Sequence, residues 1–179
     1  ENIISMITDM GIMVHESAPD IESLLLSGRS SGSSVDVVAA EEAVAVLSSH
    51  ENIIGLKESV ADESRWQALY PLASPGFSLL SGDDETFVRA MIGGAHGVIS
   101  VASNAVPATF ARICRYVSEQ NFDAALALDG QLQELYAFLG VEPNPVPIKA
   151  IMKLLGFGRG LRLPLLSLSD DYTGKADEM

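Results

Sequence analysis

Short apolar runs alternate with segments of helical spacing along the chain from residue 52 onward. Three such runs, at residues 52–57, 77–80 and 97–101, are largely apolar and do not alternate with polar residues. Runs of this kind are typical of strands buried on both faces of a parallel sheet. Because a helical segment follows each run, we predict parallel strands joined by helical crossovers.

The predicted helices carry recognisable start signals. Asp62, the pair Asp83–Asp84 and Pro107 stand where helices are expected to begin, since carboxylates suit a helix N-terminus and proline suits the first turn. The apolar residues that recur at helical spacing are Trp66, Leu69, Tyr70, Phe87, Val88, Met91, Phe110, Ile113 and Val117.

Beyond residue 120 the pattern contains helices without strands. Asn121 is a candidate cap for the first helix, and residues 148–155 form the second, which Gly156 ends. Three prolines exclude a helix over residues 141–147. We expect the last segment, residues 171–179, to be a polar, frayed tail.

Composition narrows the classes of partner. The 179 residues are 47% hydrophobic and 20% charged, as in a globular protein. The net charge of -13, with 11 Lys and Arg, argues against binding to nucleic acid or to an anionic membrane surface. The three histidines lack metal-ligand spacing, so we expect no metal site. Residues 90–111 lack charged side chains apart from histidine, but glycine, asparagine and proline interrupt them, so we do not expect a membrane span.

Polar residues gather where the predicted strands end. Lys57, Glu58 and Ser59 follow the first strand, and residues 81–83 follow the second. In a (β/α) barrel the chemistry lies at these C-terminal strand ends. A buried ammonium is costly, so Lys57 either reaches water or has an amine that reacts.

Four motifs in this order resemble the dihydrodipicolinate synthase family, within the pyruvate-dependent class I aldolases. They are N-I-I-G-L-K-E-S, L-L-S-G-D-D, G-G-A-H-G-V-I-S-V and V-E-P-N-P-V-P-I-K. The resemblance runs from about residue 28 to about residue 170. It implies an α/β fold, a partial TIM (β/α)8 barrel. The chain would hold the C-terminal half-barrel, with parallel strands, followed by extra C-terminal helices. A closed barrel takes roughly 250 residues, more than this chain has.

The same resemblance implies a division into four segments. Residues 1–27 form a divergent N-terminal segment, and residues 28–120 form the C-terminal βα units of the barrel. Residues 121–170 form a helical extension, and residues 171–179 the polar tail.

The resemblance also implies a reaction and a site. The family condenses pyruvate with aspartate 4-semialdehyde in lysine biosynthesis, as a cytoplasmic homo-oligomer, or in the plastid of plants and algae. It needs no cofactor beyond a covalent imine with pyruvate. Lys57 matches the lysine that forms this Schiff base, and Gly82 and Ile99 match positions that line the pyruvate pocket. Arg29 matches an arginine that helps to hold a substrate carboxylate, although a solvated loop arginine is the other interpretation.

Part of the family's machinery is absent from this sequence. The family's proton-relay tyrosine precedes the arginine motif, where residues 24–27 here read L-L-L-S. The threonine pair of the relay belongs to the N-terminal half of the barrel, which the chain lacks. Three readings therefore remain open: a lyase that needs the rest of the barrel, a non-catalytic half-barrel that packs against a partner or itself, and another pyruvate aldolase.

Overall fold

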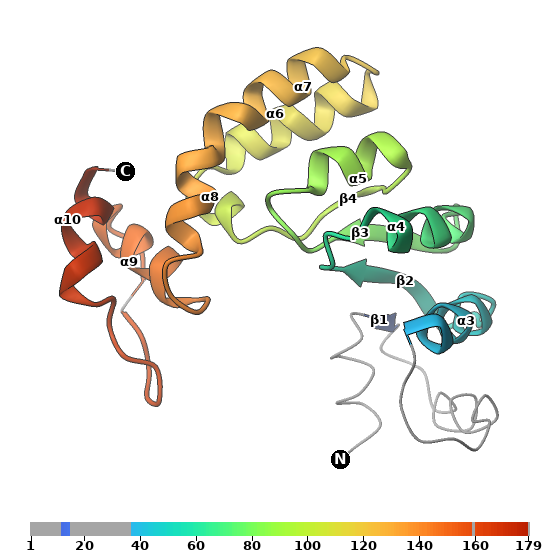
Figure 1. Ribbon diagram of the computed structural model, residues 1–179, viewed down its shortest axis with the longest axis horizontal. Helices are drawn as coiled ribbons and strands as arrows, with labels where there is room; N and C mark the ends of the chain where they lie inside the picture. The colour runs from blue at the N-terminus through green and yellow to red at the C-terminus, as the bar shows by residue number, and fades with distance from the viewer. Residues whose placement is uncertain (1–11, 15–36, 159, 179) are drawn as a thin grey trace. The chain divides into compact units, whose positions relative to one another are not determined.

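The computed structural model describes residues 12–14, 37–158 and 160–178 (Figure 1). The chain divides into two compact units, Glu1–Ile99 and Ser100–Met179. The boundary predicted from the order of elements and the resemblance lies near residue 120. The division into four segments remains a prediction.

The first unit is a small sheet with helical crossovers. Its elements are β1 (Ile12–Val14), α3 (Val37–Leu47), β2 (Ile53–Glu58), α4 (Glu63–Leu69), η1 (Tyr70–Leu72), β3 (Ser78–Ser81), α5 (Phe87–Gly93) and β4 (Gly97–Val98). The sheet order is β1-β2-β3-β4. The strand–helix alternation after residue 52 is confirmed.

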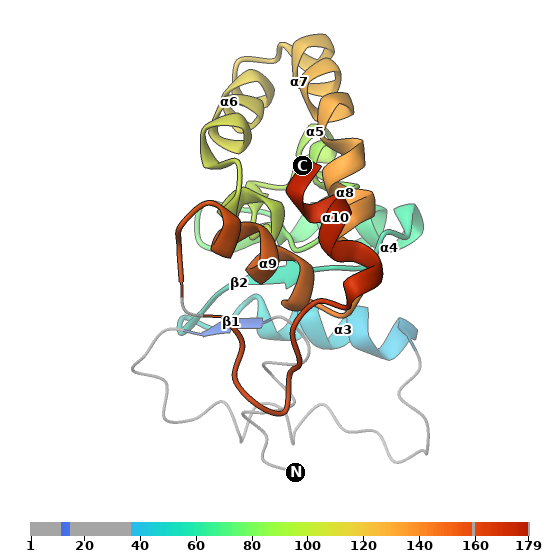
Figure 2. The ribbon, with the colours of Figure 1, turned by 90° about the vertical axis from the view of Figure 1, so that its left-hand side faces the viewer.

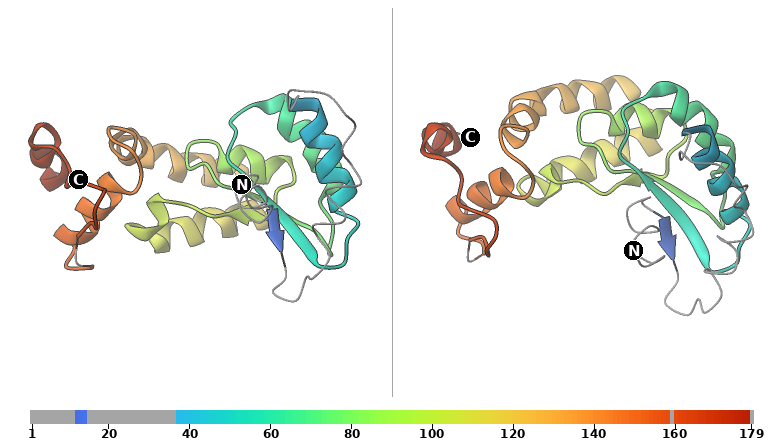
Figure 3. Two further views of the ribbon diagram at one scale, coloured as in Figure 1. Left: turned by 90° about the horizontal axis from the view of Figure 1, so that it is seen from below. Right: turned by 60° about the horizontal axis from the view of Figure 1, so that its bottom comes forward.

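Strands β2, β3 and β4 are parallel, as predicted. Lys57 pairs with Leu80 across β2 and β3, and Ser81 pairs with Val98 across β3 and β4. Strand β1 was not foreseen: it runs antiparallel to β2, with Ile12 opposite Leu56 (Figure 3). Main-chain hydrogen bonds hold an edge strand of three residues, and so short a strand leaves no readable pattern in the sequence.

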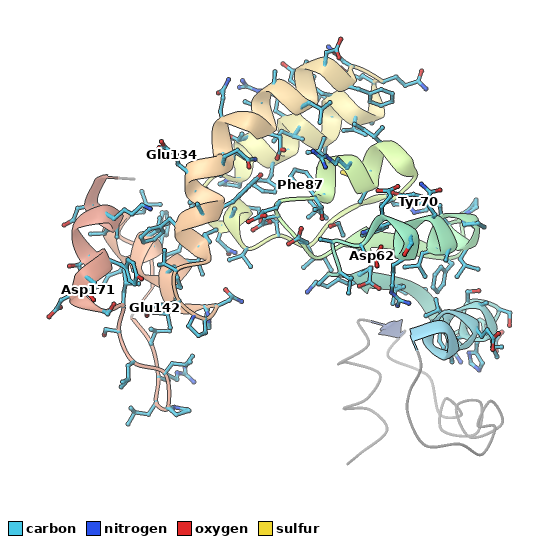
Figure 4. The ribbon with its side chains drawn as sticks, in the orientation of Figure 1. Asp62, Tyr70, Phe87, Glu134, Glu142 and Asp171 are labelled. Carbon is cyan, nitrogen blue, oxygen red and sulfur yellow. The ribbon has the colours of Figure 1, made fainter. Side chains whose placement is uncertain are left out.

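Helix α4 begins at the predicted cap. Asp62, labelled in Figure 4, accepts hydrogen bonds from the backbone N–H and the hydroxyl of Ser64, both at 2.8 Å. These bonds lower the pKa of the Asp62 carboxyl below its ordinary value. Trp66 is buried and donates its indole N–H to the carbonyl of Val60 at 2.9 Å. The helix thereby closes over the sheet, and its apolar face joins a core that includes Leu56 and Leu79.

Helix α5 begins later than predicted. Asp83 accepts hydrogen bonds from the backbone N–H of Thr86 at 3.0 Å and from its hydroxyl at 2.6 Å, in a turn that precedes the helix. Asp83 therefore stabilises the turn after β3 rather than the first helical turn. The helix ends as predicted at Gly94, whose φ of 131° suits glycine.

Strand β4 is shorter than the predicted run of residues 97–101. It spans Gly97–Val98, although Ile99 still donates its N–H to the carbonyl of Ser81 at 2.7 Å. From Ser100 the chain turns into η2 (Ala102–Asn104), since the Ser100 hydroxyl oxygen accepts a hydrogen bond from the Ser103 N–H at 2.8 Å. Local side-chain bonding of this kind competes with the extended backbone.

The second unit is helical. After η2 it contains α6 (Pro107–Ser118), α7 (Phe122–Asp129), η3 (Gly130–Leu132), α8 (Gln133–Leu139), α9 (Val146–Leu154) and α10 (Asp170–Glu178). Helices α6 and α7 pack side by side (Figure 2), and Phe110, Ile113 and Ala125 of these helices are buried. Asn121 caps α7, as predicted, by accepting from the N–H of Ala124 at 3.4 Å.

Two expectations for this unit were wrong. Helix α9 starts at Val146 rather than at residue 148, because Pro147 fits its first turn. The tail is helical rather than frayed: α10 covers Asp170–Glu178, and Ala176 is only 6% exposed. Asp170 and Asp171 in its first turn and Lys175 in its last suit the helix dipole. Among the described residues, no helix is long and apolar enough to span a membrane.

Candidate active site

Lys57 lies at the C-terminal end of β2, the second-last residue of the strand. Its side chain is half-buried. Successive side chains of a strand point to opposite faces, so Lys57 faces away from Leu56 and Glu58. Both of those neighbours are buried, and Glu58 is only 6% exposed. The lysine thus stands on the opposite face of β2 from these two side chains.

Glu58 fixes this end of the strand. Its Oε2 accepts a hydrogen bond from Arg65 Nε on α4 at 2.7 Å, and its Oε1 accepts from the backbone N–H of Val60 at 2.8 Å. Both partners of the ion pair are largely shielded from water, which strengthens it relative to a surface pair. The segment that carries Lys57 is therefore anchored to the helix behind it.

Gly82, which follows β3, packs directly against the Lys57 side chain. A Cβ atom at this position would overlap Lys57 Cε and Ser59 Oγ, and would lie 3.1 Å from Lys57 Cγ. The backbone N–H of Gly82 donates to the carbonyl of Glu58 at 2.7 Å, so the two segments stay paired beyond the strand ends. With a larger residue here, the Lys57 side chain and the Ser59 hydroxyl would have to shift.

The turn that contains Gly82 is held by short polar contacts. Ser81 has no exposed surface, and its hydroxyl contacts the N–H and the carbonyl of Asp83, both at 3.2 Å. Together with the bonds from Thr86 to Asp83, these contacts order the chain on both sides of Gly82. The wall beside Lys57 is consequently preorganised.

The other two predicted site residues have different outcomes. Ile99 follows β4, and its side chain is 46% exposed. Strands β2, β3 and β4 are parallel neighbours, and Lys57, Gly82 and Ile99 lie at or just after their C-terminal ends. The three residues therefore lie at the same edge of the sheet. Arg29 lies outside the described residues. The predicted roles of all four residues in binding pyruvate remain predictions.

Ser59 was not among the residues predicted from the sequence to form the site. A Cβ atom added to Gly82 would overlap both Ser59 Oγ and Lys57 Cε. The Ser59 hydroxyl therefore lies beside the Lys57 side chain. The spacing of two residues between Lys57 and Ser59 was the available signal, because residues i and i+2 share one face of a strand. A serine hydroxyl both donates and accepts hydrogen bonds.

The part of the chain that the structure describes contains no cluster of three His, Cys, Asp or Glu side chains able to hold a metal ion. The chemistry offered by the strand ends is instead that of an amine beside a hydroxyl and a bare glycine backbone. An amine in such a place suits covalent catalysis on a carbonyl compound.

Comparison with known proteins agrees with this architecture. Residues 31–179 match the model of the dihydrodipicolinate synthetase family. Over 138 residues the chain is 46% identical to the 4-hydroxy-tetrahydrodipicolinate synthase of Stenotrophomonas maltophilia strain K279a, covering 77% of this chain and 46% of that protein. Over 132 residues it is 45% identical to the synthase of Teredinibacter turnerae, covering 73% of this chain and 45% of that protein.

Solved structures give the same result. The dihydrodipicolinate synthase of Aquifex aeolicus superposes with a TM-score of 0.72 at 34% identity, covering 77% of this chain and 48% of that one. The chloride-inhibited synthase of Acinetobacter baumannii, in complex with pyruvate, superposes with a TM-score of 0.72 at 30% identity and the same coverage. A monomeric synthase variant gives a TM-score of 0.73 at 29% identity, again with that coverage.

The chain spans about half the length of the relatives that it matches. The parallel strands β2–β4 with their crossover helices are consistent with part of an α/β barrel, which confirms the predicted fold class. The motifs around Lys57 and the match over residues 31–179 lead to one conclusion: the chain belongs to the dihydrodipicolinate synthetase family.

Proposed function

We propose that this chain supplies the lysine half of a lyase that joins pyruvate to aspartate 4-semialdehyde in lysine biosynthesis. The observation that carries the proposal is the packing of the Lys57 stem against Gly82 and Ser59, at the C-terminal edge of parallel strands. Family membership supports the reaction class, and the pyruvate complex of the Acinetobacter baumannii relative supports the keto acid.

The proposed chemistry begins at Lys57. Its neutral amine adds to the keto carbon of pyruvate, and the carbonyl oxygen leaves as water, so that an imine forms. The methyl group then loses a proton to the relay expected from the rest of the barrel, and the imine accepts the electron pair that is released. The resulting enamine attacks the aldehyde carbon, whose oxygen takes up a proton from the same relay. Water finally cleaves the imine and returns the lysine. The covalent imine on Lys57 is this chain's own contribution to activating pyruvate.

The remaining site residues have positioning roles in the proposal. Gly82 lets the backbone and a small keto acid approach the amine closely, and Ile99 provides an apolar contact. Arg29 would hold a substrate carboxylate with its paired donors. The relay tyrosine and threonines are expected from outside this chain, so turnover requires the rest of the barrel.

A second candidate function is that of a non-catalytic half-barrel that associates with itself or with a partner. Two observations favour it: Ile54 and Ile99 are 45% and 46% exposed, and in the described sheet β4 has a neighbouring strand on one side only. Exposed apolar side chains and an open strand edge promote association. We therefore also propose a homo-oligomer, whose mass can be measured by sedimentation velocity.

The decisive experiment traps the imine. The 179-residue chain is incubated with pyruvate and borohydride, which reduces an imine to a stable amine, and the intact mass and the modified peptide are determined. We expect one reduced pyruvate adduct on Lys57, no adduct in Lys57→Ala, and an unchanged adduct in Lys175→Ala, which removes a lysine from the surface of α10.

The outcomes separate the two candidates. An adduct on Lys57 supports a reactive half-site, and pyruvate consumption with aspartate 4-semialdehyde can then be measured after adding a chain that carries the N-terminal half-barrel. If a folded sample gives no adduct, or gives one that persists in Lys57→Ala, the lyase proposal is wrong for this chain. The half-barrel reading would then be preferred.

A further inference from the structure

A cavity lies entirely within the helical unit. This cavity, of about 220 Å³, is bordered by α9, by residues 160–168 and by α10. Helices α9 and α10 pack against each other in this unit (Figure 2). The volume is below the roughly 300–1,000 Å³ of sites for drug-sized ligands, so it suits a small molecule.

Two lysines give the cavity a positive side. Lys149 and Lys153 both line it from α9, and their spacing of four residues places them on one face of the helix. Within the described residues, neither ammonium has a carboxylate within 4.0 Å. Two neighbouring cations repel each other, and an anion between them removes that repulsion.

One acidic side chain faces the same cavity. Asp177 of α10 lines it, so the charged lining consists of two cations and one anion. A singly charged anion balances this excess of one positive charge. Thr173 also contributes, but its hydroxyl already donates to the carbonyl of Asp170 at 3.0 Å.

Apart from Ser167, the rest of the lining is apolar. Val146, Leu168 and Ala176 are buried at 6%, 8% and 6% exposure, and each borders the cavity. Leu154 and Leu161 complete this apolar side. A ligand that covers these side chains gains free energy in proportion to the hydrocarbon surface that it buries.

The loop that closes the cavity is held in place at its far end. The backbone N–H of Ser169 donates to Glu142 Oε1 at 3.1 Å, and the neighbouring Leu168 is buried. The apolar side is thus tied to the turn before α9 as well as to α10. A preformed site binds without the cost of ordering its own walls.

We propose that this cavity binds a small monocarboxylate with a hydrocarbon body. Lys149 and Lys153 hold the carboxylate, while Val146, Leu168 and Ala176 contact the hydrocarbon. The proposal does not rest on Lys57 or on the proposed lyase activity. The lining residues lie in the second unit, and the ligand has no keto group with which an amine would condense.

The test uses hexanoate as the probe and the full chain, labelled with ¹⁵N. We expect saturable changes in the amide shifts of Gly160, Ser167 and Thr173 as hexanoate is added. Hexanol lacks the charge and acetate lacks the hydrocarbon, so each should produce much smaller changes at equal concentration. The same titration in Lys57→Ala should match the wild type, which separates this site from the imine site.

Substitutions of the lysines test which ammonium binds the carboxylate. Lys149 also borders a neighbouring cavity, which Asn104 and Asn144 line. Of these two cavities, Lys153 borders only the one proposed to bind the carboxylate. Lys153→Ala should therefore weaken hexanoate binding roughly tenfold, the loss expected for one charge-assisted hydrogen bond. Lys153→Gln, which keeps most of the side chain, should weaken it similarly, and Lys175→Ala should leave it unchanged.

Three results would overturn the proposal. One is the absence of saturable shifts at the cavity residues, and another is equal binding of hexanol and hexanoate. The third is unchanged hexanoate affinity in both Lys153 variants, each shown by circular dichroism to be folded.

Discussion

The two units hold their lysines in different surroundings. In the first unit, Lys57 is half-buried at a strand end, and its stem passes Gly82 and Ser59 so closely that one added methyl group would collide with it. In the second unit, Lys149 and Lys153 are exposed on a helix beside an open cavity. A confined amine has few conformations and can be aimed at a reacting carbon, whereas exposed ammoniums keep more conformations and suit the binding of an anion without a covalent bond.

The two units also differ in the exposure of some of their leucine side chains. Leu56, Leu69 and Leu79 of the first unit have no exposed surface. Within residues 154–166 of the second unit, by contrast, Leu163 and Leu166 are 85% and 72% exposed. Leu163 and Leu166 therefore contribute little to stability, whereas the three buried leucines stabilise the first unit. The second unit is stabilised by other buried residues, such as Phe110 and Ile113.

The largest expected effect concerns this contrast in burial. Leu79→Ala should lower the free energy of unfolding by about 2–5 kcal/mol, because it opens a cavity between the sheet and α4. Leu163→Ala should change it by no more than about 0.5 kcal/mol. Urea unfolding followed by circular dichroism compares the two variants, and the fluorescence of Trp66, the single tryptophan, reports on the first unit.

Equal losses of stability in the two leucine variants would contradict this contrast. Such a result would mean that the exposed segment of the second unit is covered in solution, for instance by a second copy of the chain. Repeating the unfolding of Leu163→Ala at several protein concentrations would identify that case, since a dimer gains stability with concentration.

The second prediction tests the confinement of Lys57. Gly82→Ala places a methyl group on Lys57 Cε and Ser59 Oγ, so the lysine stem must move. Both overlapped atoms belong to flexible side chains, so the shift should cost little stability, but it displaces the amine. We therefore expect the rate of pyruvate adduct formation to fall roughly tenfold. The measurement is the time course of borohydride-trapped adduct by intact mass.

Gly76→Ala is the matched control, because a Cβ atom there would meet nothing within 4 Å. It should leave the adduct rate unchanged. If Gly82→Ala reacts as fast as Gly76→Ala, the confinement of Lys57 does not contribute to its reactivity.

The smallest expected effect concerns a thiol in the second unit. Partial burial raises the pKa of Cys114 on α6 above its ordinary value, because burial disfavours the charged thiolate. At pH 8 less of the thiol is ionised than in a free thiol, so alkylation by iodoacetamide should be several-fold slower than that of glutathione. The rate should rise with pH and should reach that of glutathione in guanidinium.

The raised pKa of Cys114 also makes the free energy of unfolding fall at high pH. While the thiol is protonated in both the folded and the unfolded state, its raised pKa does not reduce the stability of the fold. As the pH rises above the ordinary value near 9.0, the unfolded chain ionises first and stability falls. Equal alkylation rates for the folded and unfolded protein would show that α6 does not shield Cys114.

The sequence by itself determined the local elements and the family. Asp62 as a helix cap, the short apolar runs and the breaks at Gly94 and Gly156 are local signals, and the hydrogen bonds that they specify form between residues close in sequence. The position of Lys57 at the end of a parallel strand followed from the same signals, as did the resemblance that the family match confirms.

The tertiary structure decided the features that join distant residues. The antiparallel edge strand β1, the burial of Ala176 in a tail expected to fray, and the contact of Gly82 with Lys57 and Ser59 all depend on neighbours far along the chain. The register of β3 against β2 brings Gly82 to the lysine stem, and no local pattern encodes that register. Local hydrogen bonding can be read from the sequence, whereas close approach between segments is fixed only when the core packs.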